Sequence, residues 1–142
     1  MSRLKITLRV DFDAIHAIGP GKVALLEKMR DSGSLSQAAR DLDMSYRRAW
    51  ELLTSLNQTF REPLVLTSTG GTGGGGTTLT EFGAAVVAAY RRFEKETNAR
   101  ADKYFGPMLK TVSSGREGAR RSITRTQRSP SAAAARRAAA TR

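Results

Sequence analysis

The stretch SLSQAARDLDMSYRRAWELLTSLNQTF, residues 34–60, is typical of two helices joined by a very short break. Ser34 or Ser36 can cap the first helix, and Ser45 is suited to cap the second, because a serine hydroxyl accepts a hydrogen bond from a free amide of the first turn. Alanines in the first helix allow it to pack closely against a neighbour. The stretch therefore predicts a helix-turn-helix.

The second helix of this pair, expected from Ser45 to Phe60, is amphipathic. Its apolar residues recur with helical spacing and form one stripe, made of Ala49, Leu52, Leu53, Leu56 and Phe60. The opposite face is polar and carries Arg47, Glu51, Thr54 and Gln58, with Arg48 and Ser55 at its edge. Trp50 falls at the edge of the stripe, where we expect it to pack in the core or at its boundary. The polar face is expected to stay exposed.

Upstream, apolar and polar residues alternate from Leu4 to Phe12, which is the period of a strand with one buried face. The segment HAIGPGK that follows predicts a turn. A helix is expected from about Pro20 to Asp31, because its apolar residues recur with helical spacing and Gly33 can end it. A strand and a helix thus precede the pair.

Downstream, the β-branched runs LVLTST and TTLT flank a run of glycines, which predicts a β-hairpin with a glycine-rich loop. Glycines let backbone amides approach a phosphate closely; alternatively, the loop is slack and makes no contact of its own. Thr80 then caps a last helix, which is expected to run to about Phe105, where Gly106 and Pro107 stop it.

This order of elements is that of a winged helix-turn-helix, a mainly α fold with a small β-sheet. In such modules the second helix of the pair enters the DNA major groove with its N-terminus first. Arg47 and Arg48 lie in that first turn, and arginine can donate two hydrogen bonds to guanine. Ser45 and the helix N-terminus suit a phosphate, and Tyr46 can donate to either partner. The alternative without DNA contact is that Arg47 pairs with Glu51 on a solvent-exposed helix face.

Three motifs carry a resemblance to a known family: S-G-S-x-S-Q-x-A at residues 32–39, S-Y-x-x-A-W at 45–50 and T-G-G-x-G-G-G-G at 69–76. At these spacings the chain resembles, over about residues 4–105, the N-terminal DNA-binding domain of the ModE molybdate-responsive regulators. That domain is itself similar to LysR-type winged helices. The resemblance implies double-stranded DNA as the partner. It also implies a homodimer that forms through the N-terminal segment and the last helix and binds a palindromic operator.

The resemblance assigns Ser45–Arg48 to the start of the recognition helix, Gln37 to the helix before it, and Gly70–Gly76 to the wing. Together with the polar face, it predicts a DNA interface of Ser36, Gln37, Ser45, Tyr46, Arg47, Arg48, Glu51, Thr54, Gly70, Gly71, Thr72 and Gly73. Thr72 stands where a basic residue is expected in some members, so wing contact depends on backbone amides. Full-length members continue into a molybdate-binding region of paired small β-barrels. An arginine-rich tail follows here, so the resemblance does not support molybdate sensing.

The last helix carries an apolar seam that a domain of this size cannot cover completely. A helix of about 25 residues is about 37 Å long at 1.5 Å per residue. Part of the seam is therefore expected to meet a second subunit, through Phe82, Val86, Tyr90, Phe93 and Tyr104. A ligand pocket at Tyr90 and Phe93 is the less favoured alternative.

The charge is concentrated at the end of the chain. The formal net charge is +11, and residues 111–142 carry eight arginines against one acidic residue. We expect residues 1–110 to form the DNA-binding and dimerisation domain and residues 111–142 a disordered basic tail. The tail is either an arm that binds DNA nonspecifically or an unselected extension. If it dominated binding, the protein would be a sequence-indifferent DNA-coating or architectural protein.

Several other functions are disfavoured by composition. With no cysteine and one histidine, His16, the chain is expected to hold no disulfide, metal or cofactor. It has neither a signal-peptide core nor an apolar run of about 18 residues, so we expect a soluble cytoplasmic protein without a membrane partner. Asp11 and Asp13 lack an acid or base partner, so no catalytic activity is expected. No small-molecule ligand is identifiable.

Overall fold

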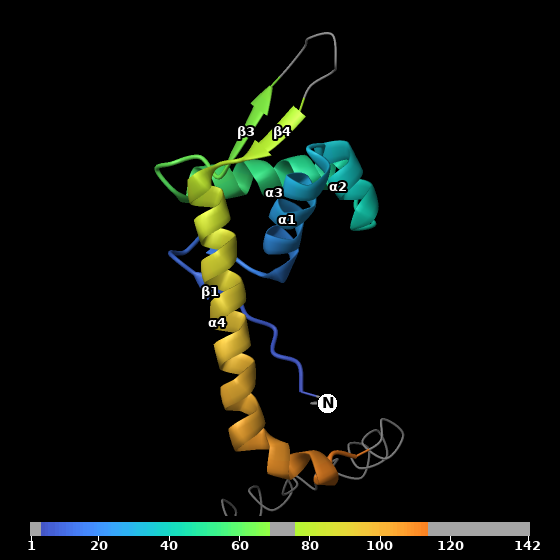
Figure 1. Ribbon diagram of the computed structural model, residues 1–142, viewed down its shortest axis with the longest axis vertical. Coiled ribbons are helices and arrows are strands. Elements are labelled where there is room, and N and C mark those ends of the chain that lie inside the picture. Colours follow the sequence, from blue (N-terminus) through green and yellow to red (C-terminus); the bar gives the residue numbers. More distant parts are fainter. Residues whose placement is uncertain (1–3, 69–75, 114–142) are drawn as a thin grey trace, which may run out of the picture. The chain divides into compact units, whose positions relative to one another are not determined.

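The computed structural model describes residues 4–68 and 76–113. Within these residues the chain is mainly helical with two small two-stranded sheets, as expected (Figure 1). The elements are β1 (Val10–Asp11), β2 (Ala17–Ile18), α1 (Pro20–Ser32), α2 (Leu35–Asp41), α3 (Tyr46–Thr59), β3 (Val65–Ser68), β4 (Gly76–Leu79), α4 (Glu81–Phe105) and a 3-10 helix, η1 (Gly106–Thr111). Among the described residues, one compact unit ends at Gly106 and a second begins at Pro107. The domain boundary expected near residue 110 stays a prediction, because residues 114–142 lie outside the described part.

The helix ends follow the capping signals in the sequence. Ser34 Oγ accepts a hydrogen bond from the Gln37 amide and caps α2, whereas Ser36 lies inside that helix. Ser45 caps α3, and Thr80 caps α4 by accepting from the amide of Gly83. Each cap satisfies an amide that the helix itself leaves free. These hydroxyls set where the helix pair turns and where α4 begins.

The strand expected from Leu4 to Phe12 is wrong over most of its length. Only Val10–Asp11 is a strand, and it pairs antiparallel with Ala17–Ile18, inside the segment expected to be a turn. The residues before β1 bond to α4 instead. The Ile6 amide donates to the side chain of Asn98 at 3.1 Å, and the Tyr90 hydroxyl donates to the Leu8 carbonyl at 2.8 Å. Since a helix offers no free backbone ladder, the alternating segment packs without becoming a strand.

The core lies where α1 packs against α2, α3, α4 and β4. The side chains of α1 that enter it are fully buried and comprise Val23, Leu25, Leu26 and Met29. From α3, the buried members of the expected stripe are Ala49, Leu53 and Leu56. Burial of each large side chain stabilises the fold by about 1.5–3 kcal/mol. This packing holds α3 with its polar face outward.

The β3–β4 hairpin follows α3 and leads into α4, as a wing does. The strands pair antiparallel from Val65 with Leu79 to Ser68 with Gly76. Figure 1 shows the hairpin projecting beyond the helices of the pair. The glycine-rich loop at its tip, residues 69–75, lies outside the described residues.

The helix α4 stops at Phe105, as expected. The chain then continues as the 3-10 helix η1 rather than leaving helical structure.

Candidate nucleic-acid interface

The first turn of α3 presents two arginines to solvent. Ser45 Oγ accepts a hydrogen bond from the Arg48 amide at 3.1 Å, which fixes where this turn starts. The side chain of Arg47 is 90% exposed and that of Arg48 is 62% exposed. Arg47 Nε donates to Glu51 at 3.3 Å, whereas Arg48 lies 3.9 Å from the same carboxylate. Exposed pairs of this kind contribute about 0–1 kcal/mol, so both arginines are free to exchange partners.

The other residues of the helix pair that were expected to contact DNA differ in whether they already form hydrogen bonds within the protein. Ser36 is exposed on α2. Gln37 already donates to Asp41 at 2.8 Å and accepts from Arg40 at 3.0 Å. Thr54 Oγ1 donates back to the Trp50 carbonyl at 2.9 Å. Ser36 is therefore free to donate to a phosphate, while Gln37 would first have to leave its partners.

Four of the expected wing contacts fall on the undescribed tip of the hairpin. These are Gly70, Gly71, Thr72 and Gly73, all outside the described residues. Their assignment stays a prediction. The hairpin base, in contrast, is placed directly beside the helix pair.

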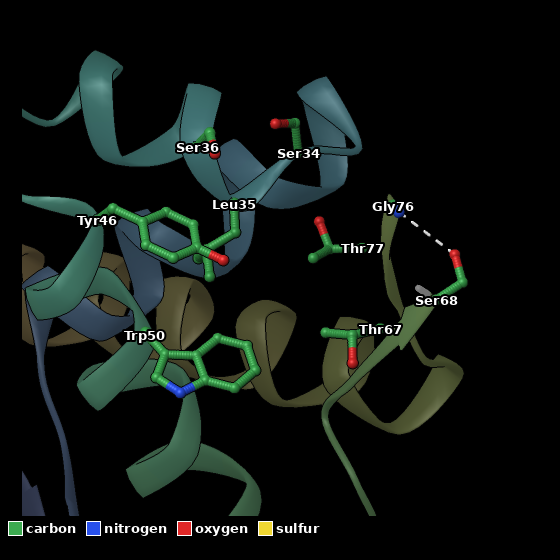
Figure 2. A pocket seen from close by; sticks show the side chains of 9 residues that line it. All are labelled: Ser34, Leu35, Ser36, Tyr46, Trp50, Thr67, Ser68, Gly76 and Thr77. Atoms are coloured by element: carbon green, nitrogen blue, oxygen red, sulfur yellow. Dashed lines mark hydrogen bonds between the residues drawn. The ribbon is translucent and has the colours of Figure 1, made fainter. Parts of the chain in front are cut away.

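A cleft of about 220 Å³ separates α3 from the base of the hairpin (Figure 2). The rings of Tyr46 and Trp50 lie on one side of it, and Thr67 and Thr77 lie on the other. Ser34, Leu35 and Ser36 line its remaining edge. Trp50 is 48% exposed here, so it lies at the boundary of the core rather than inside it. Because the helix pair and the hairpin both border this cleft, one DNA strand could contact both.

The cleft contains one polar group that the described residues leave unsatisfied. Thr77 is only 9% exposed, and its Oγ1 has no hydrogen-bond partner among residues 4–68 and 76–113. Its backbone amide donates to the Gly33 carbonyl at 3.0 Å, which fixes β4 to the end of α1. Nearby, the Gly76 amide donates to Ser68 Oγ at 3.3 Å (Figure 2). The hairpin base is thus anchored to the end of α1 by a backbone hydrogen bond.

Lys22 and Arg9, two basic residues that the sequence analysis did not single out, line a cavity on the other flank of α3. Lys22, at the start of α1, donates from Nζ to the Ala17 carbonyl at 2.8 Å and to Ser55 Oγ at 3.0 Å. Burial lowers the pKa of Lys22, and the charges of Arg9 and Arg48 lower it further. The only signal for Lys22 in the sequence was a basic residue in the first turn of a helix, and Arg9 had none.

Asp13 and His16, two of the polar residues near the N-terminus, bond to each other within the turn between β1 and β2. Asp13 Oδ1 accepts from the amides of Ile15 and His16, and Oδ2 lies 2.7 Å from His16 Nδ1. These contacts, led by the His16 side chain, lower the pKa of Asp13 to about 2. The carboxylate therefore serves the turn between β1 and β2. Asp11, Asp13 and His16 are not among the residues that line the three cavities of about 220, 320 and 500 Å³ in the described part of the chain.

The expected dimer residues separate into buried and exposed sets. Tyr90 is buried in its own chain, and the ring of Phe82 packs edge-on against Phe60 at 5.3 Å between centroids. Phe93 and Tyr104 are 50% and 67% exposed. An apolar groove of about 320 Å³ runs between α4 and the N-terminal segment, and its lining includes Phe82, Val86, Tyr90 and Phe93 together with Val10 and Phe12. Dimerisation through this face stays a prediction.

The arrangement defines a class of protein. A capped helix pair with an exposed basic first turn, followed by a hairpin beside it and a long helix, is a winged helix-turn-helix DNA-binding domain. Residues 21–84 match the family of bacterial regulatory helix-turn-helix proteins of the lysR type. The chain therefore contains a lysR-family helix-turn-helix domain, and ModE regulators are homologues of its N-terminal part.

Three relatives illustrate this similarity. The molybdenum transport protein ModE of Azotobacter vinelandii is 35% identical over 102 residues, which is 72% of this chain and 38% of that protein. The transcriptional regulator ModE of Haemophilus influenzae is 34% identical over 95 residues, 67% of this chain and 37% of the relative. The DNA-binding transcriptional dual regulator ModE of Escherichia coli K12 is 41% identical over 71 residues, 50% of this chain and 27% of the relative. The chain thus spans less than half the length of these relatives.

These matches agree with the resemblance drawn from the three motifs. The matching family consists of regulatory DNA-binding proteins and not of enzymes. Across the described ranges, no helix combines the length and apolar character that a membrane crossing requires. The same residues contain no group of three or more histidine or acidic side chains placed to hold a metal ion.

Proposed function

We propose that this protein is a sequence-specific transcriptional regulator that binds a palindromic DNA operator as a homodimer in the cytoplasm. The observation that carries the proposal is the first turn of α3. Its two arginines are exposed, weakly paired and positioned by the Ser45 cap. The hairpin base beside them supports the same conclusion, because a wing contacts the DNA next to the recognition helix.

Base recognition is assigned to the first turn of α3, and chiefly to Arg47, because Arg48 lies only at the edge of the polar face. An arginine that donates two hydrogen bonds to guanine O6 and N7 contributes about 1–3 kcal/mol of discrimination against other bases. To do so, Arg47 exchanges its bond to Glu51 for the base edge, at little cost because the pair is solvated. Ser36 and Tyr46 are assigned to the phosphate backbone, which sets register but carries no sequence information.

The homodimer is supported by the apolar face of α4. Phe93 remains half exposed beside an apolar groove, and exposed apolar surface of this kind marks interaction sites. A two-fold dimer would place two copies of α3 on half-sites about 34–36 Å apart, one turn of DNA. For an effector we make no assignment. The name of the Azotobacter vinelandii relative refers to molybdenum transport, but the family match covers the DNA-binding part of this chain.

The test is a competition binding assay with operator sequences selected from random DNA. The variant Arg47→Ala/Arg48→Ala should lose about 1–3 kcal/mol of discrimination between selected and random duplexes for each base contact removed. The variant Arg92→Ala/Arg100→Ala removes the same charge from α4 and should keep the discrimination. If the α3 variant still discriminates like the wild type, α3 does not read the sequence.

The same assay tests the architectural alternative. A chain truncated after Val112 lacks the arginine-rich tail, which carries eight of the 24 basic residues. A specific regulator should retain its preferred sequence after truncation and lose mainly salt-dependent affinity. Equal affinity for all duplexes, abolished by truncation, would instead identify a DNA-coating protein.

A further inference from the structure

A cavity of about 500 Å³ opens on the flank of α3 that faces away from the hairpin. Three cationic side chains line it: Arg9 from the N-terminal segment, Lys22 from α1 and Arg48 from α3. No aspartate or glutamate is among its lining residues. The cavity is therefore positively charged, which favours an anion.

The cation at its base is held in place. Lys22 Nζ bonds to the Ala17 carbonyl and to Ser55 Oγ, which leaves its third proton free to donate. Neither partner is charged, so the ammonium is not neutralised by them. The positive charges of Arg9 and Arg48 lower the pKa of Lys22, which shows that all three act on one region.

The two arginines at the rim pair only with solvent-exposed acids among the described residues. Arg9 Nε bonds to Asp11 at 2.7 Å, and both side chains are largely exposed. Arg48 lies 3.9 Å from Glu51. Exposed pairs are weak, so an oxyanion can compete for both guanidinium groups, which match oxyanions with paired N–H donors.

The position of the cavity indicates where such an anion comes from. An α-helix with its side chains is about 10–12 Å across and fills a major groove about 12 Å wide, so the two DNA strands lie on its two flanks. On one flank of α3 are Trp50 and the hairpin base. On the other flank are Arg48, Ser55 and the cationic cavity.

We propose that Arg9, Lys22 and Arg48 form a phosphate-binding site, and that it takes a backbone phosphate of the DNA strand opposite the wing. The assignment to DNA rests on the proposed function, while a free phosphate group is the other source of the same chemistry. The three side chains, rather than the start of α1, define the site. It extends the DNA-contacting surface to two residues outside the helix pair and wing.

The test measures how the affinity of the full chain for DNA depends on salt. Each neutralised phosphate contributes about 0.9 to the slope of log affinity against log salt. The variants Arg9→Gln and Arg9→Gln/Lys22→Gln should lower the slope, the double variant by about 0.9, on selected and random duplexes alike. The matched control is Arg30→Gln, which removes a charge near the other end of α1 and should leave the slope unchanged. Because Arg9 is exposed, its single variant keeps the test valid if the double variant does not fold.

A second arm detects a free phosphate group without DNA. Inorganic phosphate is titrated into the wild type and the Arg9→Gln variant, and the amide resonances of Gly21 and Lys22 are followed by NMR, with chloride as the reference. A reduced salt slope identifies the DNA backbone as the source. An unchanged slope with saturable shifts in the wild type only identifies a free phosphate group. An unchanged slope without such shifts overturns the site.

These outcomes separate this proposal from the proposed function. Loss of a backbone phosphate contact weakens binding to all sequences, whereas failure of the α3 assignment changes discrimination between sequences. A chain that binds random DNA without any preferred operator would still show the reduced slope.

Discussion

Gly83 shows how one missing methyl group lets α4 begin beneath the hairpin. A Cβ at this position would collide with the backbone carbonyl oxygen of Leu64 and lie 2.7 Å from Leu79 Cδ1. We therefore expect Gly83→Ala to lower the free energy of unfolding by about 1–3 kcal/mol, because backbone atoms cannot yield as side chains do. Urea unfolding of both proteins measures the difference.

The control for this prediction is Gly106→Ala. Nothing lies within 4 Å of a Cβ built there, and its backbone is already right-handed helical, with φ −51° and ψ −47°. This substitution should leave stability unchanged or raise it by up to about 1 kcal/mol. Equal destabilisation by both alanines would show that close packing at Gly83 is not the cause.

The contacts of Asp13 lead to a second prediction, which concerns how stability depends on pH. Its pKa is lowered from 3.8 to about 2, so the folded protein binds this proton less readily than the unfolded chain does. The stabilisation is therefore present above about pH 3.8 and is lost as the pH falls through about 2. NMR titration of the Asp13 carboxyl should give a midpoint near 2. In His16→Ala the midpoint should rise toward 3.8, and an unchanged midpoint would contradict the assigned cause.

Arg91 connects two helices and gives a prediction about their packing. From α4 it donates through Nε to Glu27 of α1 at 3.1 Å and through Nη1 to Glu94 at 2.8 Å. Glu27 and Glu94 raise the pKa of Arg91. Arg91→Met should lower the free energy of unfolding by about 1–2 kcal/mol, because charged hydrogen bonds are lost at a partly exposed site.

The neighbouring residue is a matched control. Within the part of the chain that the structure describes, Arg92 pairs only with Glu96 on its own helix, at 3.0 Å, and both side chains are exposed. Arg92→Met should cost about 0.3–0.5 kcal/mol. Chemical denaturation of the two variants compares the bridge between helices with a pair within one helix. Similar losses would mean that Arg91 contributes little to holding α4 against α1.

For the assembled protein, the prediction concerns the apolar groove beside α4. Phe93→Glu places a charge at a half-exposed position of this groove and should convert the proposed homodimer into a monomer, because burying an unpaired charge is costly. Ala88→Glu adds the same charge at an exposed position of another face of α4 and should leave the dimer intact. Sedimentation equilibrium distinguishes the two masses. A monomeric wild type would contradict the homodimer.

The sequence predicted the ends of the helices better than it predicted the structure of the N-terminal segment. Ser34, Ser45 and Thr80 cap the helices as their positions in the sequence indicate, because a cap involves residues within one turn. The alternation from Leu4 to Phe12 indicated an inward face, but its residues up to Val10 are only partly buried, Phe12 is exposed, and the partner of the face was not indicated. That partner is α4, through Asn98 and Tyr90, more than 80 residues away.

The candidate DNA interface also has features that the sequence predicted and features that it did not. Local spacing was enough to identify the helix pair, the outward face of α3 and the two arginines of its first turn, since helical periodicity and capping act over a few residues. The cleft at Trp50 and the cationic cavity at Lys22 were not predictable, because their walls come from segments distant in the chain. Contacts such as Lys22 with Ser55 form only when the core positions α1 against α3. Side chains from separate elements meet through packing, which no local pattern encodes.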